Sequence, residues 1–419
     1  MSKIKTIFAR EILDSRGDPT VETTVILSDG ASARSSVPSG SSKGTYEAME
    51  LRDNDKSRLN GKGVLNAVSN VNTIIAPKLL GMDAFAQQKI DKTMIELDGT
   101  QNKGRLGSNA ILSVSQAVAK ASSRSSLLPL AVYLRQFISS NDTLNKIPTP
   151  MFNLIEGGRH SHQGAINFQE ILLVPATSKT FSESLELGLK VFHSLKGIIT
   201  DKMMSTLSAD EGGFSPQLST NQEAINTLKS AVERAGFSFA LDAFIGLDVA
   251  ANSILDGKKY RLLDRTVPYS SDELIDFYDQ LVSDFSIIYL EDPLAEDDWE
   301  GWKKLYNKIG TKTVVCGDDL VTTNPYRLQL AIDNNVLNGI IIKPNQIGTV
   351  TEALAVAEMA KYKKYKITVS HRSGETSDDF IADFATAIGA DNVKFGAPAR
   401  ERVIKYNRLL EIEKELQKI

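Results

Sequence analysis

The strongest constraint on the fold of this chain is a pattern repeated through its second half, where short apolar runs end at an ionisable residue. The runs FIGL, IIYL, TVVCG, GIII, ITVS and NV lead into Asp248, Glu291, Asp318, Lys343, His371 and Lys394. Each interval leaves room for one strand, one loop and one helix. Strands that alternate with helices form a parallel sheet, and about 250 residues of such units close into an eight-stranded barrel. We therefore predict a TIM-type (β/α)8 barrel in residues 139–419.

Capping boxes mark the helix starts in this region. In a capping box, a Ser or Thr side chain and a Glu three residues later exchange hydrogen bonds with the backbone. The segments Thr180 to Glu183, Thr220 to Glu223 and Ser270 to Glu273 each fit this pattern ahead of an apolar helical stretch. They predict helices that begin just after Thr180, Thr220 and Ser270.

The first 138 residues follow a different order. KTIFAREI and PTVETTVILS read as two strands of a hairpin, with Gly17 and Pro19 in the turn. A helical pattern follows from Glu47 to about Gln136. Strands followed by helices predict an α+β cap domain over residues 1–138. The polar, proline-bearing segment 139–150 reads as a linker to the catalytic domain at 139–419.

Composition narrows the class of protein. Hydrophobic residues make up 42% of the chain and charged residues 24%, which excludes disordered and fibrous classes. A net charge of −4 without a basic face argues against nucleic acid, so a small molecule is the expected partner. The single cysteine, Cys316, fits a reducing compartment. Charge interrupts the N-terminus early and no long apolar run occurs, so we expect a cytoplasmic protein without membrane insertion.

The strand-end carboxylates Asp248, Glu291 and Asp318 predict a metal centre. In a TIM-type barrel they would share one mouth, where three desolvated carboxylates repel one another unless a highly charged cation neutralises them. Oxygen ligands without His or Cys favour Mg2+ or Mn2+ over zinc. Taken singly, each acidic residue could equally cap a helix or solvate a loop.

Other ionisable residues fit acid and base roles. An ammonium near a divalent cation loses its proton more readily, so Lys343 or Lys394 could act as a base, although a lone Lys is more often an ion-pair partner. Glu170, after the strand-like INFQ, and Glu211, in the turn DEGG, form a second carboxylate pair that could protonate a leaving hydroxyl. Turn chemistry explains these two glutamates equally well.

Three loops carry residues suited to an anionic ligand. Arg372 and Ser373, beside His371, offer donors for a phosphate. The segment from Pro38 to Gly44, with its serines and glycines, could be a lid or a loose connection. GGRH supplies His160 in a second such loop. The remaining histidines, His162 and His193, are assigned structural roles.

These residues together resemble the enolase family, the phosphopyruvate hydratases of glycolysis. The matching segments are DSRGDPTVE, VPSGSSKGTYEAMELRD, LDGT, NAILSVS, GGRH, QE, DEGGFSP, GLD, EDPLAEDDW, GDDL, IKPNQIG, SHRSGET and GAPAR. They run almost end to end. The resemblance implies an α+β cap followed by a modified barrel whose first units depart from the regular strand and helix order.

The resemblance also implies a division of roles in converting 2-phosphoglycerate to phosphoenolpyruvate. Lys343 would remove the α-proton, and Glu211, steadied by Glu170, would protonate the departing hydroxyl. Two Mg2+ ions would take part, the second arriving with substrate and assisted by Ser42. The implied ligands of the first Mg2+ are Asp248, Glu291 and Asp318. Lys394 would hold the enolate together with both metals, and His160 would close over the phosphate, so these two residues count as catalytic as well. The implied substrate-binding residues are His160, Glu170, Glu291, Asp318, Lys343, Arg372, Ser373 and Lys394.

The resemblance further implies a homodimer or an octamer of dimers, and a surface-associated fraction besides the cytoplasmic one. Glu156 and Lys43 stand where the family usually carries Asn and Thr, and we hypothesise that their opposite charges compensate each other. Glu411 stands where the family usually carries an Arg that faces an acidic residue, here Glu22. Two like charges would weaken the dimer, unless Arg408 substitutes.

Two alternatives to a competent hydratase stay open. One is another α-proton abstraction of the same superfamily, against which Arg372, Ser373 and the intact DEGG turn argue. The other is a divergent paralogue that acts mainly as a binding or scaffold protein, which only Glu156 and Lys43 favour. The presence of all three acidic residues, Asp248, Glu291 and Asp318, argues against it, because a site that does not catalyse a reaction has no physical need for carboxylates that repel one another.

Overall fold

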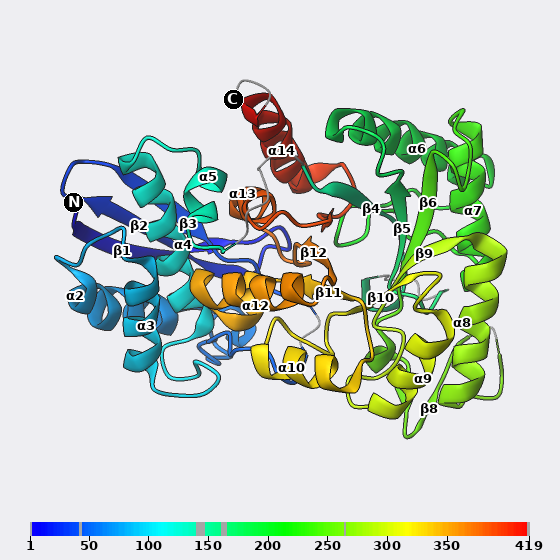
Figure 1. Ribbon diagram of the computed structural model, residues 1–419, viewed down its shortest axis with the longest axis horizontal. Helices are drawn as coiled ribbons and strands as arrows, with labels where there is room; N and C mark the ends of the chain where they lie inside the picture. Colours follow the sequence, from blue (N-terminus) through cyan, green and yellow to red (C-terminus); the bar gives the residue numbers. More distant parts are fainter. Residues whose placement is uncertain (1, 42–43, 140–146, 161–165, 264, 417–419) are drawn as a thin grey trace.

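The computed structural model describes residues 2–41, 44–139, 147–160, 166–263 and 265–416. Within them, an N-terminal sheet with its helices lies beside a barrel ringed by helices (Figure 1). Each unit has its own apolar core. The division between residues 138 and 139 stays a prediction, and side chains of Leu130 and Ile138 pack into the core of the barrel.

The N-terminal sheet is an antiparallel meander. Its strands are β1 (Ile4–Leu13), β2 (Pro19–Leu27) and β3 (Ser32–Ser36), in that order. Gly17, in the turn between β1 and β2, has a φ of +78°, a left-handed conformation that glycine adopts without strain. The predicted hairpin is therefore confirmed.

One buried helix joins this sheet to the barrel. The helices of the N-terminal unit are η1 (Leu59–Gly61), α1 (Leu65–Asn70), the π-helical η2 (Val71–Ile75), α2 (Ala76–Leu79), α3 (Gln87–Asp98), α4 (Ser108–Ser125) and α5 (Leu130–Arg135). Helix α4 packs against β2 and β3, and also against two helices of the barrel unit, α11 (Pro344–Ile347) and α12 (Val350–Tyr362). Its alanines and serines are buried on several faces because both units approach it closely.

The second unit is a closed eight-stranded barrel. Its strands in spatial order are β4 (Thr149–Glu156), β5 (Glu170–Pro175), β6 (Ala243–Asp248), β9 (Ile287–Glu291), β10 (Val314–Gly317), β11 (Gly339–Ile342), β12 (Lys366–Ser370) and β13 (Asn392–Lys394). Strand β5 is antiparallel to both of its neighbours, and the other pairs are parallel. The modified barrel is thus confirmed, and its irregularity is the reversed second strand.

Helices cover the outside of the barrel (Figure 1). They are α6 (Phe181–Asp201), α7 (Asn221–Arg234), α8 (Ser271–Phe285), α9 (Trp299–Ile309), α10 (Pro325–Asn334), α11 (Pro344–Ile347), α12 (Val350–Tyr362), α13 (Phe380–Ala387) and α14 (Val403–Leu416). Shorter elements are η3 (Gly158–His160), η4 (Ala251–Ser253), β7 (Leu255–Asp256), β8 (Lys259–Tyr260) and η5 (Arg400–Arg402). No helix among the described residues has the length and apolar content needed to cross a bilayer.

Helices begin after all three predicted capping residues, and two of the three capping boxes are complete. Thr180 and Ser270 form complete capping boxes with Glu183 and Glu273. At the third predicted box, Thr220 accepts from the Glu223 backbone N–H, but the Glu223 carboxylate accepts from Ser219 N instead of closing the box. Residues 140–146 of the predicted linker lie outside the described residues, and its last two residues, Thr149 and Pro150, belong to β4.

An ion-pair network that is largely buried at Lys120 and Asp378 and more exposed at Asp379 ties the two units together. Lys120 on α4 contacts Asp378 at 2.8 Å and Asp379 at 3.1 Å, both from the loop before α13. Asp378 also accepts hydrogen bonds from Ser35 Oγ and Ser36 N of the N-terminal sheet. Burial opposes both charges, but the carboxylates outweigh it and raise the pKa of Lys120, while Lys120 lowers the pKa of Asp378.

We expect Lys120→Met to lower the free energy of unfolding at pH 7 by about 3 to 5 kcal/mol, because it leaves a buried carboxylate without its cation. The pair stabilises fully above the ordinary pKa of Asp, 3.8, and below that of Lys, 10.5. Its contribution is lost as pH falls through the folded pKa of Asp378 or rises through that of Lys120. Urea unfolding across pH tests this.

The matched control is Lys92→Met, which removes an exposed pair with Glu96 on α3. We expect the control to change stability by less than about 1 kcal/mol. Equal losses from the two variants would contradict the role assigned to the buried network.

Candidate active site

The six strand-end residues gather at one end of the barrel, as the sequence pattern predicts. Asp248 and Glu291 are the last residues of β6 and β9 and lie opposite each other in the parallel ladder. Asp318, Lys343 and His371 each follow directly on β10, β11 and β12, and Lys394 ends β13. This end of the barrel is called the mouth below. Parallel strands bring their C-terminal ends to one edge, which is why residues far apart in sequence meet there.

Lys394 lies among three carboxylates of the mouth. Its Nζ atom is 2.8 Å from Glu291 Oε1, 3.0 Å from Asp248 Oδ2 and 3.1 Å from Glu170 Oε2. All four side chains are almost completely buried. Burial opposes the ammonium form, but the three carboxylates outweigh it and raise the pKa of Lys394 well above its usual value.

The third predicted ligand, Asp318, is next to the candidate base. Asp318 Oδ2 contacts Lys343 Nζ, and Asp318 Oδ1 accepts a hydrogen bond from Gln346 Nε2 at 3.0 Å. Burial lowers the pKa of Lys343, yet Asp318 outweighs it and raises this pKa. Lys343 is therefore an ammonium as long as the Asp318 carboxylate faces it.

A second acidic group lies behind Asp318. Oxygens of Asp292, Asp318 and Asp319 lie within 4.8 Å of one another. However, Asp292 uses both carboxylate oxygens to accept from Asp318 N at 2.8 Å and Asp319 N at 2.7 Å. Asp292 therefore holds the turn that carries Asp318, and its oxygens are engaged before any ion arrives.

The charge at the mouth fits a divalent cation. When all three carboxyl groups are ionised, the single positive charge of Lys394 leaves two negative charges uncompensated. Burial, followed by the nearby Asp248, raises the pKa of Glu291 to about 8, and burial raises that of Glu170 well above its usual value. Without a further cation Glu291 therefore favours its protonated form near neutral pH, which relieves part of this excess of negative charge. Oxygens of Asp248, Glu291 and Asp318 suit a hard ion such as Mg2+.

Glu170 lies at the mouth for a reason other than the predicted one. INFQ was predicted to be a strand that ends at Glu170, but Glu170 is instead the first residue of β5. Because β5 runs opposite to its neighbours, its first residue pairs with the last residues of β4 and β6, Glu156 and Asp248. The reversed strand thus adds a carboxylate that a regular barrel would place at the opposite end.

Glu211 and His160 lie on the same side of the mouth as Glu170. His160 Nδ1 is 3.7 Å from Glu170 Oε1, and His160 Nε2 is 3.7 Å from Glu211 Oε1. His160 Nδ1 is buried and has no hydrogen-bond partner among the described residues. A buried polar atom without a partner marks a place where a ligand or water can bind.

The sequence did not indicate that His371 and Arg402 act together on Glu211. His371 Nε2 is 2.8 Å from Glu211 Oε2, and Arg402 Nη1 donates to His371 Nδ1 at 2.9 Å. Because the Arg402 guanidinium can only donate, His371 Nδ1 must accept, and the ring proton is on Nε2 facing Glu211. Burial lowers the pKa of His371 to about 4, so the ring is neutral. Arg402 comes from η5 and carries no local signal of this contact.

Arg372 and Ser373 also lie at the mouth. The Arg372 guanidinium contacts the Glu47 carboxylate of the N-terminal unit at 3.0 and 3.2 Å. Ser373 Oγ is 3.3 Å from both Glu211 Oε1 and His160 Nε2. The predicted phosphate-binding pair is therefore beside the candidate acid, and Glu47, which the sequence did not single out, neutralises Arg372.

The serine-rich segment from Pro38 to Gly44 contacts the same region. Ser39 and Gly374 exchange two backbone hydrogen bonds of 2.8 Å, and Ser41 Oγ is 2.9 Å from Ser373 Oγ. Ser42, the predicted ligand of a second Mg2+, and Lys43 lie outside the described residues. So does His162, while His193 packs edge-on against Phe192 on α6.

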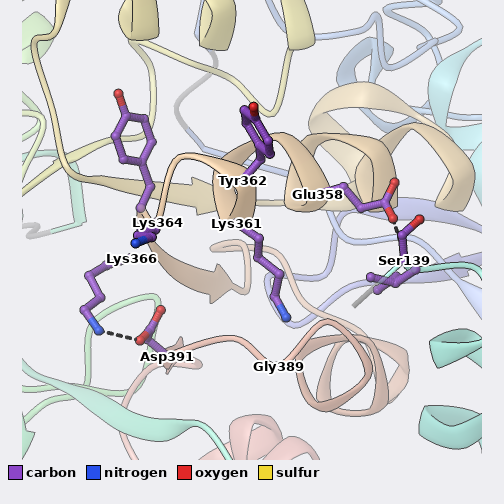
Figure 2. Close-up of a pocket in the computed structure, with 10 residues that line it drawn as sticks. Ser139, Glu358, Lys361, Tyr362, Lys364, Lys366, Gly389 and Asp391 are labelled. Atoms are coloured by element: carbon purple, nitrogen blue, oxygen red, sulfur yellow. Dashed lines mark hydrogen bonds and ion pairs between the residues drawn. The ribbon is translucent and has the colours of Figure 1, made fainter. Parts of the chain in front are cut away.

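A separate cavity lies at the opposite end of the barrel. It measures about 660 Å³ and is lined by residues such as Lys361, Tyr365, Lys366 and Asp391 (Figure 2). Lys366 begins β12, and its Nζ pairs with Asp391 Oδ1 at 2.8 Å. Lysine and carboxylate there neutralise each other near solvent, whereas the mouth concentrates buried charge. We therefore place the candidate active site at the mouth.

The fold and the site define a class of protein: a two-domain α/β barrel with a carboxylate-rich, lysine-bearing mouth covered by segments of its smaller domain. Family comparison agrees with this description over nearly the whole chain. The model for "Enolase, N-terminal domain" matches residues 4–134, and that for "Enolase, C-terminal TIM barrel domain" matches residues 144–419. The chain belongs to the enolase family.

We expect Lys394→Met to lower the free energy of unfolding by about 3 kcal/mol in metal-free buffer, because it removes the ammonium that pairs with the buried carboxyl groups of Asp248, Glu291 and Glu170. Denaturant unfolding in the presence of EDTA measures this. Lys366→Met is the control, since it removes a lysine from the opposite end of the barrel whose side chain is 55% exposed. A loss no larger than that of the control would contradict the account of the mouth.

Proposed function

We propose that this chain is a phosphopyruvate hydratase, a carbon–oxygen lyase that reversibly dehydrates 2-phospho-D-glycerate to phosphoenolpyruvate in glycolysis and gluconeogenesis. The observation that carries the proposal is that one mouth holds a candidate base, Lys343, a candidate acid, Glu211, and a set of carboxylates suited to a divalent ion. Removal of water from a hydroxy acid needs these three elements: a base for the α-proton, an acid for the leaving hydroxyl and positive charge near the carboxylate.

The proposed metal requirement is two Mg2+ per active site. Asp248, Glu291 and Asp318 would hold the first ion, and Ser42 would help to hold the second when substrate is present. When bound, Mg2+ supplies positive charge that stabilises the negative charge developing on the substrate carboxylate. The uncompensated negative charge around Lys394 supports this requirement.

Lys343 is the proposed base. To accept the α-proton it must first be neutral, and three local effects favour that form: its burial and the positive charges of Arg372 and Lys394. The Asp318 carboxylate is the largest effect that opposes them, and it raises the pKa of Lys343 above its usual value. Once the charge of Asp318 is neutralised, burial and the charges of Arg372 and Lys394 lower the pKa of Lys343, and the smaller effect of Glu291 opposes them.

Glu211 is the proposed acid, with Glu170 beside it. Burial favours the protonated carboxyl of Glu211, but His371 and His160 outweigh burial and lower its pKa. A substrate with a phosphate and a carboxylate adds negative charge to the mouth, which favours protonation of Glu211. The protonated carboxyl then donates to the departing hydroxyl, and water leaves.

The remaining residues of the mouth would bind and orient the substrate. Arg372 and Ser373 would hold the phosphate, for which Arg372 would leave Glu47. His160 would close over the phosphate, and Lys394 would stay near the substrate carboxylate. Closure of the segment from Pro38 to Gly44 over the mouth would exclude water and so strengthen these charged contacts.

The proposed protein is a cytoplasmic homodimer or a larger assembly of dimers. Within one chain, Glu22 pairs with Arg10 at 2.8 Å, and Glu411 pairs with Arg408 at 3.1 Å. The predicted repulsion between the two glutamates is therefore reduced by partners of their own chain. Arg408 itself is committed to Asp383 through two hydrogen bonds of 2.7 and 2.8 Å, so it is poorly placed to serve a partner chain.

The direct test is ultraviolet detection of phosphoenolpyruvate formed from 2-phosphoglycerate, with Mg2+ and then with EDTA. We expect Mg2+-dependent turnover that falls at least about 100-fold in Lys343→Met, because no other group replaces a general base. Lys366→Met, at the other end of the barrel, should retain the parent rate. Turnover that is unchanged when EDTA is added would contradict the metal assignment. Absence of turnover with Mg2+ would favour a binding or scaffold role.

A further inference from the structure

Glu156 is a buried carboxylate at the mouth that the mechanism above does not use. It is the last residue of β4, and its side chain has no exposed surface. Its Oε1 atom accepts from Gly213 N at 2.7 Å, and its Oε2 atom accepts from Glu211 N at 3.1 Å. One side chain thus binds both ends of the short segment that begins with the candidate acid.

These contacts require a carboxylate. Two converging backbone N–H groups need two acceptor atoms, and a carboxylate offers one on each oxygen. An amide of the same length offers one acceptor, and its NH2 group would face the other N–H. Leaving a buried N–H without an acceptor costs free energy, so the turn would shift.

The turn is packed tightly onto this carboxylate. A methyl group added at Gly213 would lie 2.9 Å from Glu156 Oε1 and 2.7 Å from the backbone oxygen of Asn153. The residue that follows the turn is also hydrogen-bonded to β4: Glu156 N donates to Phe214 O, and Phe214 N donates to Leu154 O. Movement of Glu156 is therefore passed to the turn.

The side chain of Glu211 reaches away from this anchor toward the substrate side. Its Oε2 atom meets His371 Nε2 at 2.8 Å and Asn153 Nδ2 at 3.1 Å, and its Oε1 atom meets Ser373 Oγ at 3.3 Å. Such a fixed set of contacts depends on the position of the Glu211 backbone. A shift of that backbone by a fraction of an ångström changes the aim of an acid that must act at hydrogen-bonding distance.

We infer that Glu156 is a positioning residue for Glu211. It fixes the 211–213 turn through two backbone hydrogen bonds, and its own buried carboxyl group repels the charged form of the candidate acid. This inference rests on the proposed function for its effect on turnover, and on the structure alone for its effect on geometry.

The charge of Glu156 also bears on when Glu211 carries a proton. The titratable or charged groups that face Glu156 are Glu211 from the turn, His160 from η3, Glu170 from β5 and Arg402 from η5. Burial and then the charge of Glu211 raise the pKa of Glu156 well above its usual value. Two carboxyls this close titrate as a pair, and their repulsion retains a shared proton to higher pH. Turnover needs that proton on Glu211.

The test compares two substitutions that separate the effect of the charge of Glu156 from the effect of its side-chain length. Glu156→Gln keeps the length but loses the charge and one acceptor, and Glu156→Asp keeps the charge but loses the length. We expect kcat to fall about 10-fold or more in both, with KM changed less than about 3-fold, because the acid is misaligned while the substrate contacts remain. Only Glu156→Gln should also move the alkaline limb of the kcat profile to lower pH.

The control is Glu413→Gln, which alters another glutamate that accepts a backbone N–H, that of Phe181 at 2.9 Å. This residue lies on α14, outside the mouth, so a change in stability without a change in the pH profile is expected. If Glu156→Gln showed the parent kcat and pH profile, or if kcat and KM changed together as in a generally damaged fold, the inference would be overturned.

A crystal structure of Glu156→Gln gives a readout that does not depend on activity. We expect the distance from Glu211 Oε2 to His371 Nε2, 2.8 Å here, to lengthen beyond hydrogen-bonding reach. An unchanged turn and an unchanged distance would refute the positioning role even if the parent protein proved to have no hydratase activity. Absence of parent activity together with a displaced Glu211 would instead refute the proposed function alone.

Discussion

The structure depends on a charge imbalance at the mouth of the barrel. Lys394 faces the carboxylates of Asp248, Glu291 and Glu170 within about 3 Å, in a site closed to solvent. Burying several carboxylates costs free energy that one ammonium offsets only in part. The proposed divalent cation would complete the balance and so link the fold to the proposed chemistry.

Backbone hydrogen bonds to buried carboxylates hold the functional loops in place. Asp292 fixes the turn of Asp318, Glu156 fixes the turn of Glu211, and Glu375 accepts from Arg372 N and pairs with Lys405. Each of these carboxylates holds the backbone of a loop whose side chain is a candidate catalytic or binding residue. Charge as well as packing positions these loops. The geometry of the mouth therefore also depends on charged residues that would not touch substrate.

The regular part of this molecule was predictable, and the irregular part was not. Apolar runs that end in Asp248, Glu291 and Lys394 predicted strands and their shared edge, because period and polarity are local signals. The reversal of β5 leaves no such signal, so Glu170 was assigned to the wrong end of a strand. Contacts such as Arg402 with His371 form between loops, and Arg372 with Glu47 forms between domains, so they follow from tertiary packing alone.

The central claim is that the mouth binds a divalent ion through Asp248, Glu291 and Asp318. Anomalous diffraction from crystals grown with Mn2+, which replaces Mg2+ at oxygen sites, locates the ion directly. We predict a peak bounded by these three carboxylates, with Lys394 moved away from Asp248 and Glu291. A peak between Asp292 and Asp319 instead, or the absence of a peak at the mouth with Mn2+ in excess, would contradict the account.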